Sequence, residues 1–310
     1  MIDPLVSIIM LSYNRMQDVL ESLAEIANIE YPNLEVVVVD NASTDGTVEA
    51  VTERSKEWKN AAGESLRIHL LSLPKNIGVA AYNRGIAHSS GEYLVIIDDD
   101  SYPHSQAIRR MVDVFQVNPQ LGVVAFDVRH EDSKASVPVP SPDNWMGGPM
   151  KPIEQPYLMS FNGAGCGVRR SVLPVHGLYA ENFFLYNNEL DAAYRIWDQG
   201  YEIQFFKEIV AYHRQSLTNR TSKRAPFFYV RNAFWIAWTH LPLTHMLRVT
   251  GLLLFYCGVY TIEQKTDVYL QAAMQAFRGM KDIFSKRKPV SDRVAMQLRV
   301  PYPVFFTFYR

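Results

Sequence analysis

Four short apolar runs in the first third of the chain limit its possible folds most strongly. Each run ends in polar residues and precedes a helix-like pattern; the runs are residues 6–11, 34–39, 67–72 and 93–97. Runs rich in β-branched residues are typical of strands that are buried on both faces of a sheet. Strands that alternate with helices have right-handed crossovers and form a mostly parallel sheet. The sequence therefore predicts an α/β fold.

Polar residues at the carboxyl ends of these strands are expected to meet at one edge of the sheet, where open α/β sheets bind ligands. They are Ser12, Asp40, Asn76 and Asp98–Asp100. Asp40 can accept a hydrogen bond from a base or a ribose hydroxyl, while Asn76 and Asn83 can bridge polar groups. Lys75 and Arg84 can meet phosphate charge. This edge suits a nucleotide, although such residues are also common in ordinary turns.

Three consecutive carboxylates, Asp98, Asp99 and Asp100, follow the fourth run. Adjacent carboxylates repel one another and are costly to bury, so they need a compensating positive charge. Oxygen ligands without a neighbouring cysteine favour a hard divalent cation such as Mg²⁺ or Mn²⁺. A solvated acidic turn before the next helix is the alternative that these residues alone leave open.

The composition suits one large globular domain or two modest ones, because 48% of the 310 residues are hydrophobic. Cys166 and Cys257 lie far apart without a metal-binding pattern, so we expect neither a disulfide framework nor a thiolate site. The N-terminus lacks a signal-peptide pattern, which predicts a cytoplasmic protein. We expect no nucleic-acid partner, and a homo-oligomer is left open.

The end of the chain is basic and helical in pattern. Residues 214–310 carry 15 Lys and Arg against 4 Asp and Glu, although the formal net charge of the whole chain is −1. The apolar stretch from Val249 to Tyr260 has about a dozen residues, fewer than the roughly 20 that cross a bilayer. The region from 226 onward suits amphipathic helices on anionic lipid at the inner face of the cell membrane. Helices docked on the rest of the protein, or a subunit interface, remain alternatives.

No GxGxxG or GxxxxGK[ST] motif follows the first strand, which argues against a dinucleotide fold or a P-loop nucleotidase. Four segments instead resemble family 2 glycosyltransferases: residues 6–15, 38–47, 76–80 and 96–101. The resemblance covers roughly residues 5–215. It implies a GT-A fold, with a Rossmann-like nucleotide-binding half at about 1–125 and an acceptor half at about 126–225. The pattern of the remaining residues, 226–310, predicts a helical, basic C-terminal region.

The resemblance also assigns roles to residues of the sheet edge. It implies nucleotide-sugar contacts for Ser12, Tyr13, Asn14, Arg15, Asp40, Asn76, Asp98 and Asp99. It makes Asp98 and Asp100 a DxD element that meets Mn²⁺ or Mg²⁺, with Asp100 as the primary ligand. His213 occupies a position where the family often has a histidine that ligates the metal or contacts the diphosphate, although a lone histidine is more often structural.

The second half contains the expected acceptor side. The Pro-rich residues 137–156 are interpreted as a mobile flap or acceptor loop. Residues 161–170 contain small residues that permit close approach to a ligand, and the family places a glycine-containing segment beside the donor sugar here. A helical pattern over 192–199 ends at Gly200 and is expected to be capped by Asn187 or Asn188.

Glu189 occupies the second acidic position of the family's Glu-Asp-x-Asp element, whose carboxylate removes the acceptor proton. The sequence departs from this element, because Asn188 replaces its first Glu and Glu189 replaces its Asp. Asp191 is the alternative base, but its spacing from Arg195 also permits an intrahelical ion pair.

These assignments predict an inverting, metal-dependent glycosyltransferase that uses a deoxythymidine- or uridine-linked sugar, in the manner of rhamnosyltransferase-like members. The acceptor would be a glycan or a lipid-linked glycan in bacterial surface-polysaccharide synthesis. A nucleotidyltransferase and a catalytically silent sugar-nucleotide-binding module are the alternatives from other classes.

Overall fold

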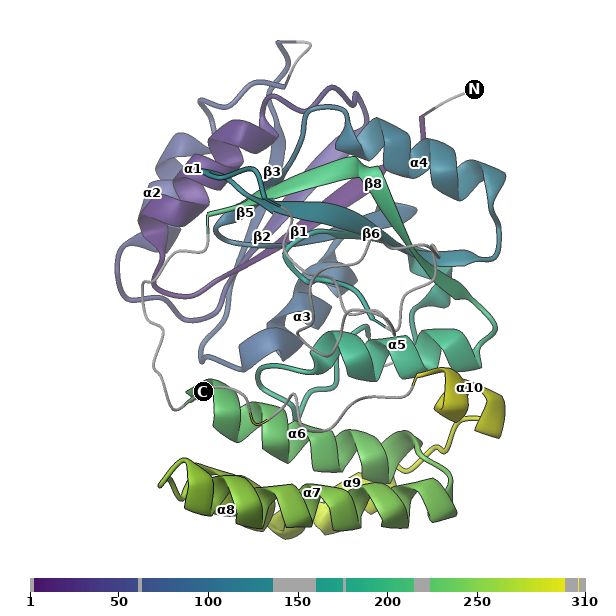
Figure 1. Cartoon of the computed structure of the whole chain (residues 1–310). Coiled ribbons are helices and arrows are strands. Elements are labelled where there is room, and N and C mark those ends of the chain that lie inside the picture. Colours follow the sequence, from purple (N-terminus) through teal and green to yellow (C-terminus); the bar gives the residue numbers. More distant parts are fainter. Residues whose placement is uncertain are drawn as a thin grey trace.

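The protein is described by a computed structural model that covers residues 3–60, 63–135, 160–174, 177–214, 224–298 and 306. Its centre is one sheet of eight strands with helices on both faces (Figure 1). The strands, in chain order, are β1 (Val6–Ser12), β2 (Leu34–Asp40), β3 (Arg67–Ser72), β4 (Tyr93–Asp98), β5 (Ser101–Pro103), β6 (Leu121–His130), β7 (Cys166–Arg169) and β8 (Glu202–His213). Their order across the sheet is β3-β2-β1-β4-β7-β6-β8-β5.

The helices form layers on either side of this sheet (Figure 1). Those on one face are α1 (Met16–Ile26), α2 (Thr47–Arg54) and α4 (Ala107–Val117). Those on the other face are α3 (Ala81–His88), which follows the short 3₁₀ turn Gly78–Ala80, and α5 (Asn188–Asp198). Beyond them lie α6 (Arg224–His240), α7 (Leu243–Glu263), α8 (Val268–Arg278), α9 (Met280–Ser285) and α10 (Asp292–Gln297).

The apolar runs form strands because both of their faces are covered. In β1, Ile8 and Met10 pack toward α1 and α4, whereas Ile9 packs toward α3. Successive side chains of a strand point to opposite faces, so an element covered on both sides needs an uninterrupted apolar sequence. β1 pairs in parallel with β2 and with β4, and Ser12 is level with Asp40. The prediction of a parallel core with its polar ends on one edge is confirmed.

The second half of the sheet is mixed. β7 runs antiparallel to both β4 and β6, whereas β6 and β8 are parallel. β8 is a strand of 12 residues that runs from Glu202 to His213. Phe126 of β6 pairs with Phe206 of β8, but the next residue of β6, Asp127, pairs with Val210. This register shift allows the long strand β8 to continue along β6. The Pro-rich segment 137–156 lies outside the described residues.

The C-terminal helices share a core with the rest of the protein. A single cluster of buried side chains includes Ile9 and Val37 of the sheet, Tyr194 of α5 and Trp235 of α6. The predicted division between 225 and 226 therefore does not separate two hydrophobic cores. Within the part of the chain that is described, α7 is the one helix long and apolar enough for a membrane span by length and composition. This helix has 21 residues, more than the dozen apolar residues that the sequence suggests.

Candidate active site

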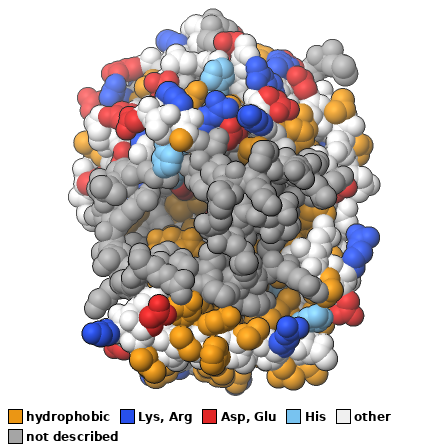
Figure 2. All heavy atoms as spheres, viewed as in Figure 1, with side chains coloured by type: hydrophobic (Ala, Val, Ile, Leu, Met, Phe, Trp, Pro, Cys, Tyr) orange, Lys and Arg blue, Asp and Glu red, His pale blue; other side chains and the backbone are white. Residues whose placement is uncertain are grey.

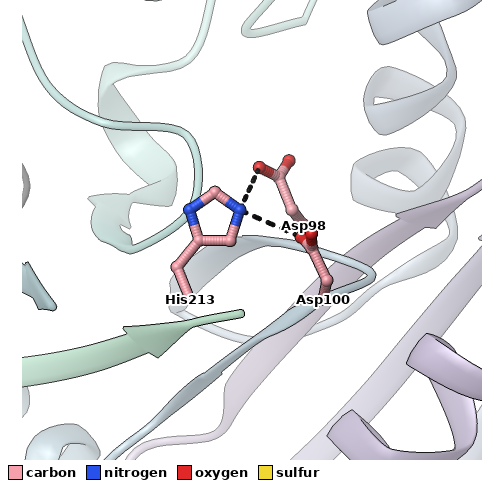
Figure 3. Close-up of side chains that lie close together, drawn as sticks. All are labelled: Asp98, Asp100 and His213. Atoms are coloured by element: carbon pink, nitrogen blue, oxygen red, sulfur yellow. Dashed lines mark ion pairs between the residues drawn. The ribbon is translucent and has the colours of Figure 1, made fainter. Parts of the chain in front are cut away.

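Asp98, Asp100 and His213 meet at the carboxyl end of β4. β4 ends at Asp98, and the short strand β5 pairs with β8 so that Ser101 is level with His213. The Nε2 atom of His213 lies 3.0 Å from Oδ1 of Asp100 and 3.9 Å from Oδ2 of Asp98 (Figure 3). The pairing of β5 with β8 thus brings His213 to two carboxylates that lie more than 100 residues earlier in the sequence.

This cluster fits a hard divalent cation. One ligand atom from each of Asp98, Asp100 and His213 lies within 4.8 Å of the other two. Asp100 and His213 are buried, whereas Asp98 is partly exposed toward the edge of the sheet. Two carboxylates and one imidazole are ligands that Mn²⁺ accepts readily, and a partly open site leaves coordination positions for water or a diphosphate.

Arg15 supplies part of the positive charge that the carboxylates need. Its Nη1 atom donates to Oδ1 of Asp99 at 2.9 Å and to Oδ2 of Asp100 at 3.2 Å. Burial raises the pKa of Asp99 to about 7, although Arg15 acts in the opposite direction. The partial enclosure of Asp98 and the charge of Asp100 also raise the pKa of Asp98, although His213 acts in the opposite direction. The sequence predicts that Arg15 contacts the nucleotide, but not that it pairs with the acidic cluster.

Ser12 and Asp40 form the neighbouring part of the edge. Both side chains are fully buried at the ends of adjacent parallel strands. Oδ2 of Asp40 accepts hydrogen bonds from the Ser43 amide and the Ser72 hydroxyl. Among the residues that the structure describes, Oδ1 of Asp40 and the Ser12 hydroxyl have no partner. Buried polar atoms are costly without a partner, so these two atoms are suited to receive a polar ligand.

Asn14 and Asn76 shape the loops around this edge. Oδ1 of Asn14 accepts a hydrogen bond from the Thr44 amide at 2.7 Å, and Asn14 itself has a left-handed backbone with φ of 53°. Oδ1 of Asn76 accepts hydrogen bonds from the Gly78 amide and from Nδ2 of Asn41. Tyr13 is exposed beside them. The structure thus places these residues at the predicted edge.

Three other predicted contacts have different surroundings. Lys75 is exposed, and Arg84 is exposed in an ion pair with Glu181 at 3.2 Å. Asn83 is buried, and its amide donates to the Tyr179 carbonyl and accepts from the Tyr179 amide. Both polar atoms of Asn83 therefore link α3 to the segment before α5, which is a structural role that the sequence does not indicate.

Glu189 lies in the first turn of α5 and faces Gly163. A Cβ atom built on Gly163 would come 2.6 Å from Oε1 of Glu189 and 3.8 Å from the Tyr179 hydroxyl. Burial raises the pKa of Glu189 to about 7, and the charge of Asp98 adds to this rise. The predicted base is therefore close enough to Asp98 for the charges of the two carboxylates to interact. Of the glycine-containing segment, Gly163 faces this site, whereas Gly167 makes room for Met111 in the core.

The turn that precedes Glu189 has an unusual backbone. Phe184, Tyr186 and Asn187 all have positive φ values, of 66°, 64° and 59°. Such conformations are costly for residues other than glycine and persist where the surrounding structure enforces them. Asn187 occupies the predicted cap position, but its side chain donates to the Tyr229 carbonyl and does not cap the helix.

α6 holds this turn in place. Nδ2 of Asn232, which is fully buried, lies 2.7 Å from the Leu185 carbonyl and 2.8 Å from the Tyr186 carbonyl. Arg231 donates to the carbonyl of Phe183. The sequence predicts a helix here but gives no signal for this contact, because the partners are almost 50 residues apart.

Asp191 is engaged in a buried network. Its Oδ2 accepts from Arg195 at 2.7 Å, and its Oδ1 lies 2.7 Å from Nε2 of His240. Burial alone would raise the pKa of Asp191, but Arg195 and His240 lower it to about 2. The predicted intrahelical pair with Arg195 is confirmed, and these contacts favour a structural role.

The sequence of this domain matches a known family model. Residues 7–175, more than half of the chain, match the model of glycosyl transferase family 2. The chain belongs to glycosyl transferase family 2.

Curated relatives of this family 2 chain align with parts of it. Poly-β-1,6-N-acetyl-D-glucosamine synthase of Staphylococcus epidermidis is 30% identical over 125 residues, which are 40% of this chain and 28% of the relative. The probable glycosyltransferase YdaM of Bacillus subtilis is 24% identical over 228 residues, which are 69% of this chain and 52% of the relative. The chain thus spans between about a quarter and a half of the length of these relatives.

Solved structures share the fold over a larger part of the chain. The mannosyltransferase PcManGT from Pyrobaculum calidifontis, in complex with GDP-Man and Mn²⁺, has a TM-score of 0.60 and 20% identity over 99% of this chain and 84% of its own. TarS 1-349 of S. aureus, in complex with UDP-GlcNAc, has a TM-score of 0.59 and 16% identity over 94% of this chain and 83% of its own. The predicted GT-A fold is confirmed.

Proposed function

We propose that this protein is an inverting, metal-dependent glycosyltransferase that moves a sugar from a nucleoside-diphosphate sugar to a hydroxyl group. The observation that carries the proposal is that Asp98, Asp100 and His213 form one cluster of possible metal ligands, and that Glu189 is close enough to Asp98 for their charges to interact. This arrangement, within a family 2 domain, supports a proton acceptor close to ligands for a diphosphate-bound cation.

Glu189 would act as the general base. A carboxylate with a pKa near 7 is ionised in a useful fraction at neutral pH and still binds a proton firmly when one is transferred to it. As the acceptor oxygen attacks the anomeric carbon, its proton passes to Glu189, and the bond from that carbon to the diphosphate oxygen breaks with its electron pair. A single displacement of this kind inverts the anomeric configuration.

Asp98, Asp100 and His213 would hold Mn²⁺ or Mg²⁺. A bound cation would supply positive charge for the diphosphate that leaves. Arg15 would keep Asp99 and Asp100 fixed at the edge of the site through its two hydrogen bonds. The mannosyltransferase structure, a neighbour in fold, is a complex with Mn²⁺, which supports this assignment.

The donor is proposed to be a uridine- or deoxythymidine-linked sugar. Oδ1 of Asp40 is a buried acceptor that suits the ring N–H of uracil or thymine, and the Ser12 hydroxyl lies on the adjacent strand. The structure of TarS with UDP-GlcNAc supports a uridine nucleotide, whereas that of the mannosyltransferase contains GDP-Man.

The acceptor is proposed to be a glycan or a lipid-linked glycan of bacterial surface polysaccharide, assembled in the cytoplasm near the inner face of the membrane. The relatives' names support this class: one is a poly-β-1,6-N-acetyl-D-glucosamine synthase and another, 32% identical over 98 residues, is the putative teichuronic acid biosynthesis glycosyltransferase TuaG of Bacillus subtilis.

A panel of nucleotide sugars tests the proposal. The purified chain should release nucleoside diphosphate from one donor in the presence of Mn²⁺ or Mg²⁺, and a chelator should stop the release. Asp100→Ala should lose both turnover and Mn²⁺ binding measured by calorimetry while keeping the circular dichroism spectrum of the wild type. Release of pyrophosphate instead would indicate a nucleotidyltransferase, and binding of a donor without turnover would indicate a silent binding module.

A further inference from the structure

α7 is apolar on two opposite sides, but only one of them is covered by protein. Met246, Val249, Leu253, Cys257 and Tyr260 are buried against the rest of the bundle. Six large apolar side chains of the same helix remain 40–80% exposed: Leu243, Leu247, Leu254, Phe255, Val259 and Ile262. A helix that is apolar all round is normally enclosed on all sides, by protein or by lipid. The exposed side of α7 therefore lacks an environment that matches its composition.

The neighbouring helices extend this surface. Leu270, Met274 and Phe277 of α8 are 41–52% exposed, and Met280 and Phe284 of α9 are 39% and 41% exposed. Figure 2 shows apolar side chains gathered at the lower end of the molecule, where Figure 1 places α7, α8 and α9. Exposed apolar patches that span several elements mark interaction sites. We call these side chains of α7, α8 and α9 the apolar face.

Basic side chains accompany the apolar face. Arg248, Arg278 and Lys281 are exposed along the same helices, Lys265 is exposed between α7 and α8, and Lys286 and Lys288 follow α9. Asp282, one of the 4 acidic residues against 15 basic ones in residues 214–310, is paired with Lys286 at 2.9 Å. Long basic side chains at the border of an apolar surface can reach the phosphates of lipid headgroups while their stems stay in the apolar layer.

We propose that the apolar face binds the surface of an anionic phospholipid bilayer, with α7 lying in the plane of the interface. The buried side of α7 argues against a span, because Leu253 and Cys257 are 0% and 1% exposed and would have to leave the bundle. The charge argues against a second copy of this chain, because a two-fold contact through this face would bring two sets of the same cations together.

This surface lies one helix layer away from the proposed base. α6 packs against α7, α8 and α9 on one side, and its Tyr229 lies close enough to Glu189 for the charge of Glu189 to raise the pKa of Tyr229. Packed helices have axes about 8–10 Å apart. A lipid-linked acceptor could therefore present its hydroxyl at the site while its lipid stays in the bilayer. This last step rests on the proposed function, but the binding to lipid does not.

Flotation of the full chain with lipid vesicles tests the proposal. The wild type is expected to float with vesicles that contain phosphatidylglycerol, and to float less with pure phosphatidylcholine or at high salt, which screens surface charge. The triple variant Leu247→Ser, Phe255→Ser and Ile262→Ser should bind the anionic vesicles about tenfold more weakly or worse, because each side chain loses apolar area. Val117→Ser, at an 82% exposed position on α4, is the matched control and should bind as the wild type does.

Several outcomes would overturn the proposal. The wild type could fail to float with anionic vesicles, or the triple variant could float equally well. Light scattering could show a wild-type dimer that the triple variant loses, without vesicle binding, which would assign the apolar face to a second copy. Resistance to extraction by alkaline carbonate would indicate a span. Release of nucleoside diphosphate in vesicle-free solution should be the same in all three proteins, so failure of the sugar transfer is measured separately.

Discussion

The Nε2 atom of His240, at the end of α6, lies 2.7 Å from Oδ1 of Asp191 in α5. Arg195 binds the other carboxylate oxygen at the same distance. Asp191 thus connects α5 to α6, two helices that the sequence assigns to different regions of the chain. It lies two residues after Glu189, the proposed base. Its buried carboxylate is held in the ionised form by both partners.

Replacing Asp191 by Asn should destabilise the fold. Removal of one member of a buried ionic network costs about 3–5 kcal/mol, because the remaining charges lose their partner. The pKa of Asp191 is lowered from its ordinary value of 3.8 to about 2, so the stabilisation is fully present above pH 3.8 and is lost as the pH falls toward 2. Urea unfolding at a series of pH values measures this difference in the free energy of unfolding.

The control for this measurement is Asp113→Asn, which changes an exposed carboxylate of α4 and should alter stability by less than about 0.5 kcal/mol. A difference between wild type and Asp191→Asn that grew as the pH fell below about 4 would contradict the network as described.

The pH dependence of sugar transfer should follow Glu189. Burial raises the pKa of Glu189 to about 7, and only the ionised form can accept a proton. The value of kcat/KM should therefore rise about tenfold per pH unit below 7 and level off above it. Glu189→Gln should lower kcat by about 10²- to 10⁴-fold. Steady-state kinetics with the donor identified by the panel measure both effects.

The residual activity of Glu189→Gln distinguishes two titrating groups. Asp99 also has a pKa raised to about 7. A flat pH profile in Glu189→Gln would assign the titration to Glu189, whereas an unchanged profile would assign it to Asp99. Wild-type kcat in Glu189→Gln would mean that another group, with Asp191 as the alternative, removes the proton.

Gly163→Ala should impair catalysis with little effect on stability. The new Cβ atom would lie 2.6 Å from Oε1 of Glu189, and the end of a flexible side chain is what has to move. Because small displacements of a reacting group are costly, we expect kcat to fall by about tenfold or more, with the KM for the donor unchanged. Gly258→Ala in α7 is the control, since no atom lies within 4 Å of its Cβ position. Equal kcat values for the two variants would argue against close contact at Gly163.

Asn232→Ala should weaken the turn before Glu189. The change removes the donor that serves the carbonyls of Leu185 and Tyr186 and leaves these groups without a buried partner. We expect a loss of about 1–3 kcal/mol in the free energy of unfolding, together with a lower kcat. Thermal unfolding and kinetics measure the two effects, and Asn28→Ala, at an exposed position just after α1, is the control. Mn²⁺ affinity should be unchanged, because Asn232 is not part of the acidic cluster.

The sheet and its acidic edge could be predicted because their signals are local. An apolar run such as 93–97 reports burial on both faces, and the direction of parallel strands places Asp98 and Asp100 on the same edge as Asp40. The role of His213 is suggested by its place in the family pattern. Its contact with Asp100 depends on the pairing of β5 with β8, which no local pattern reports.

The support of the proposed base could not be predicted for the same reason. Asn187 has the composition of a helix cap, but its side chain turns to Tyr229 in α6. Local preferences yield to tertiary contacts at such positions. The positive φ values of Phe184 and Tyr186 are equally invisible in the sequence, because neither residue type favours this conformation.

Arg231 and Asn232 donate hydrogen bonds to backbone carbonyls of residues 183–186, and these bonds limit where the chain can be truncated. A fragment that stops at residue 225 would retain every acidic side chain of the site. It would lack α6, which holds the backbone before Glu189 in its strained, positive-φ conformation. Such a fragment would also lose the hydrophobic core that α6 shares with the sheet, so it is expected to be unstable, and the C-terminal helices belong in any preparation intended for enzymology.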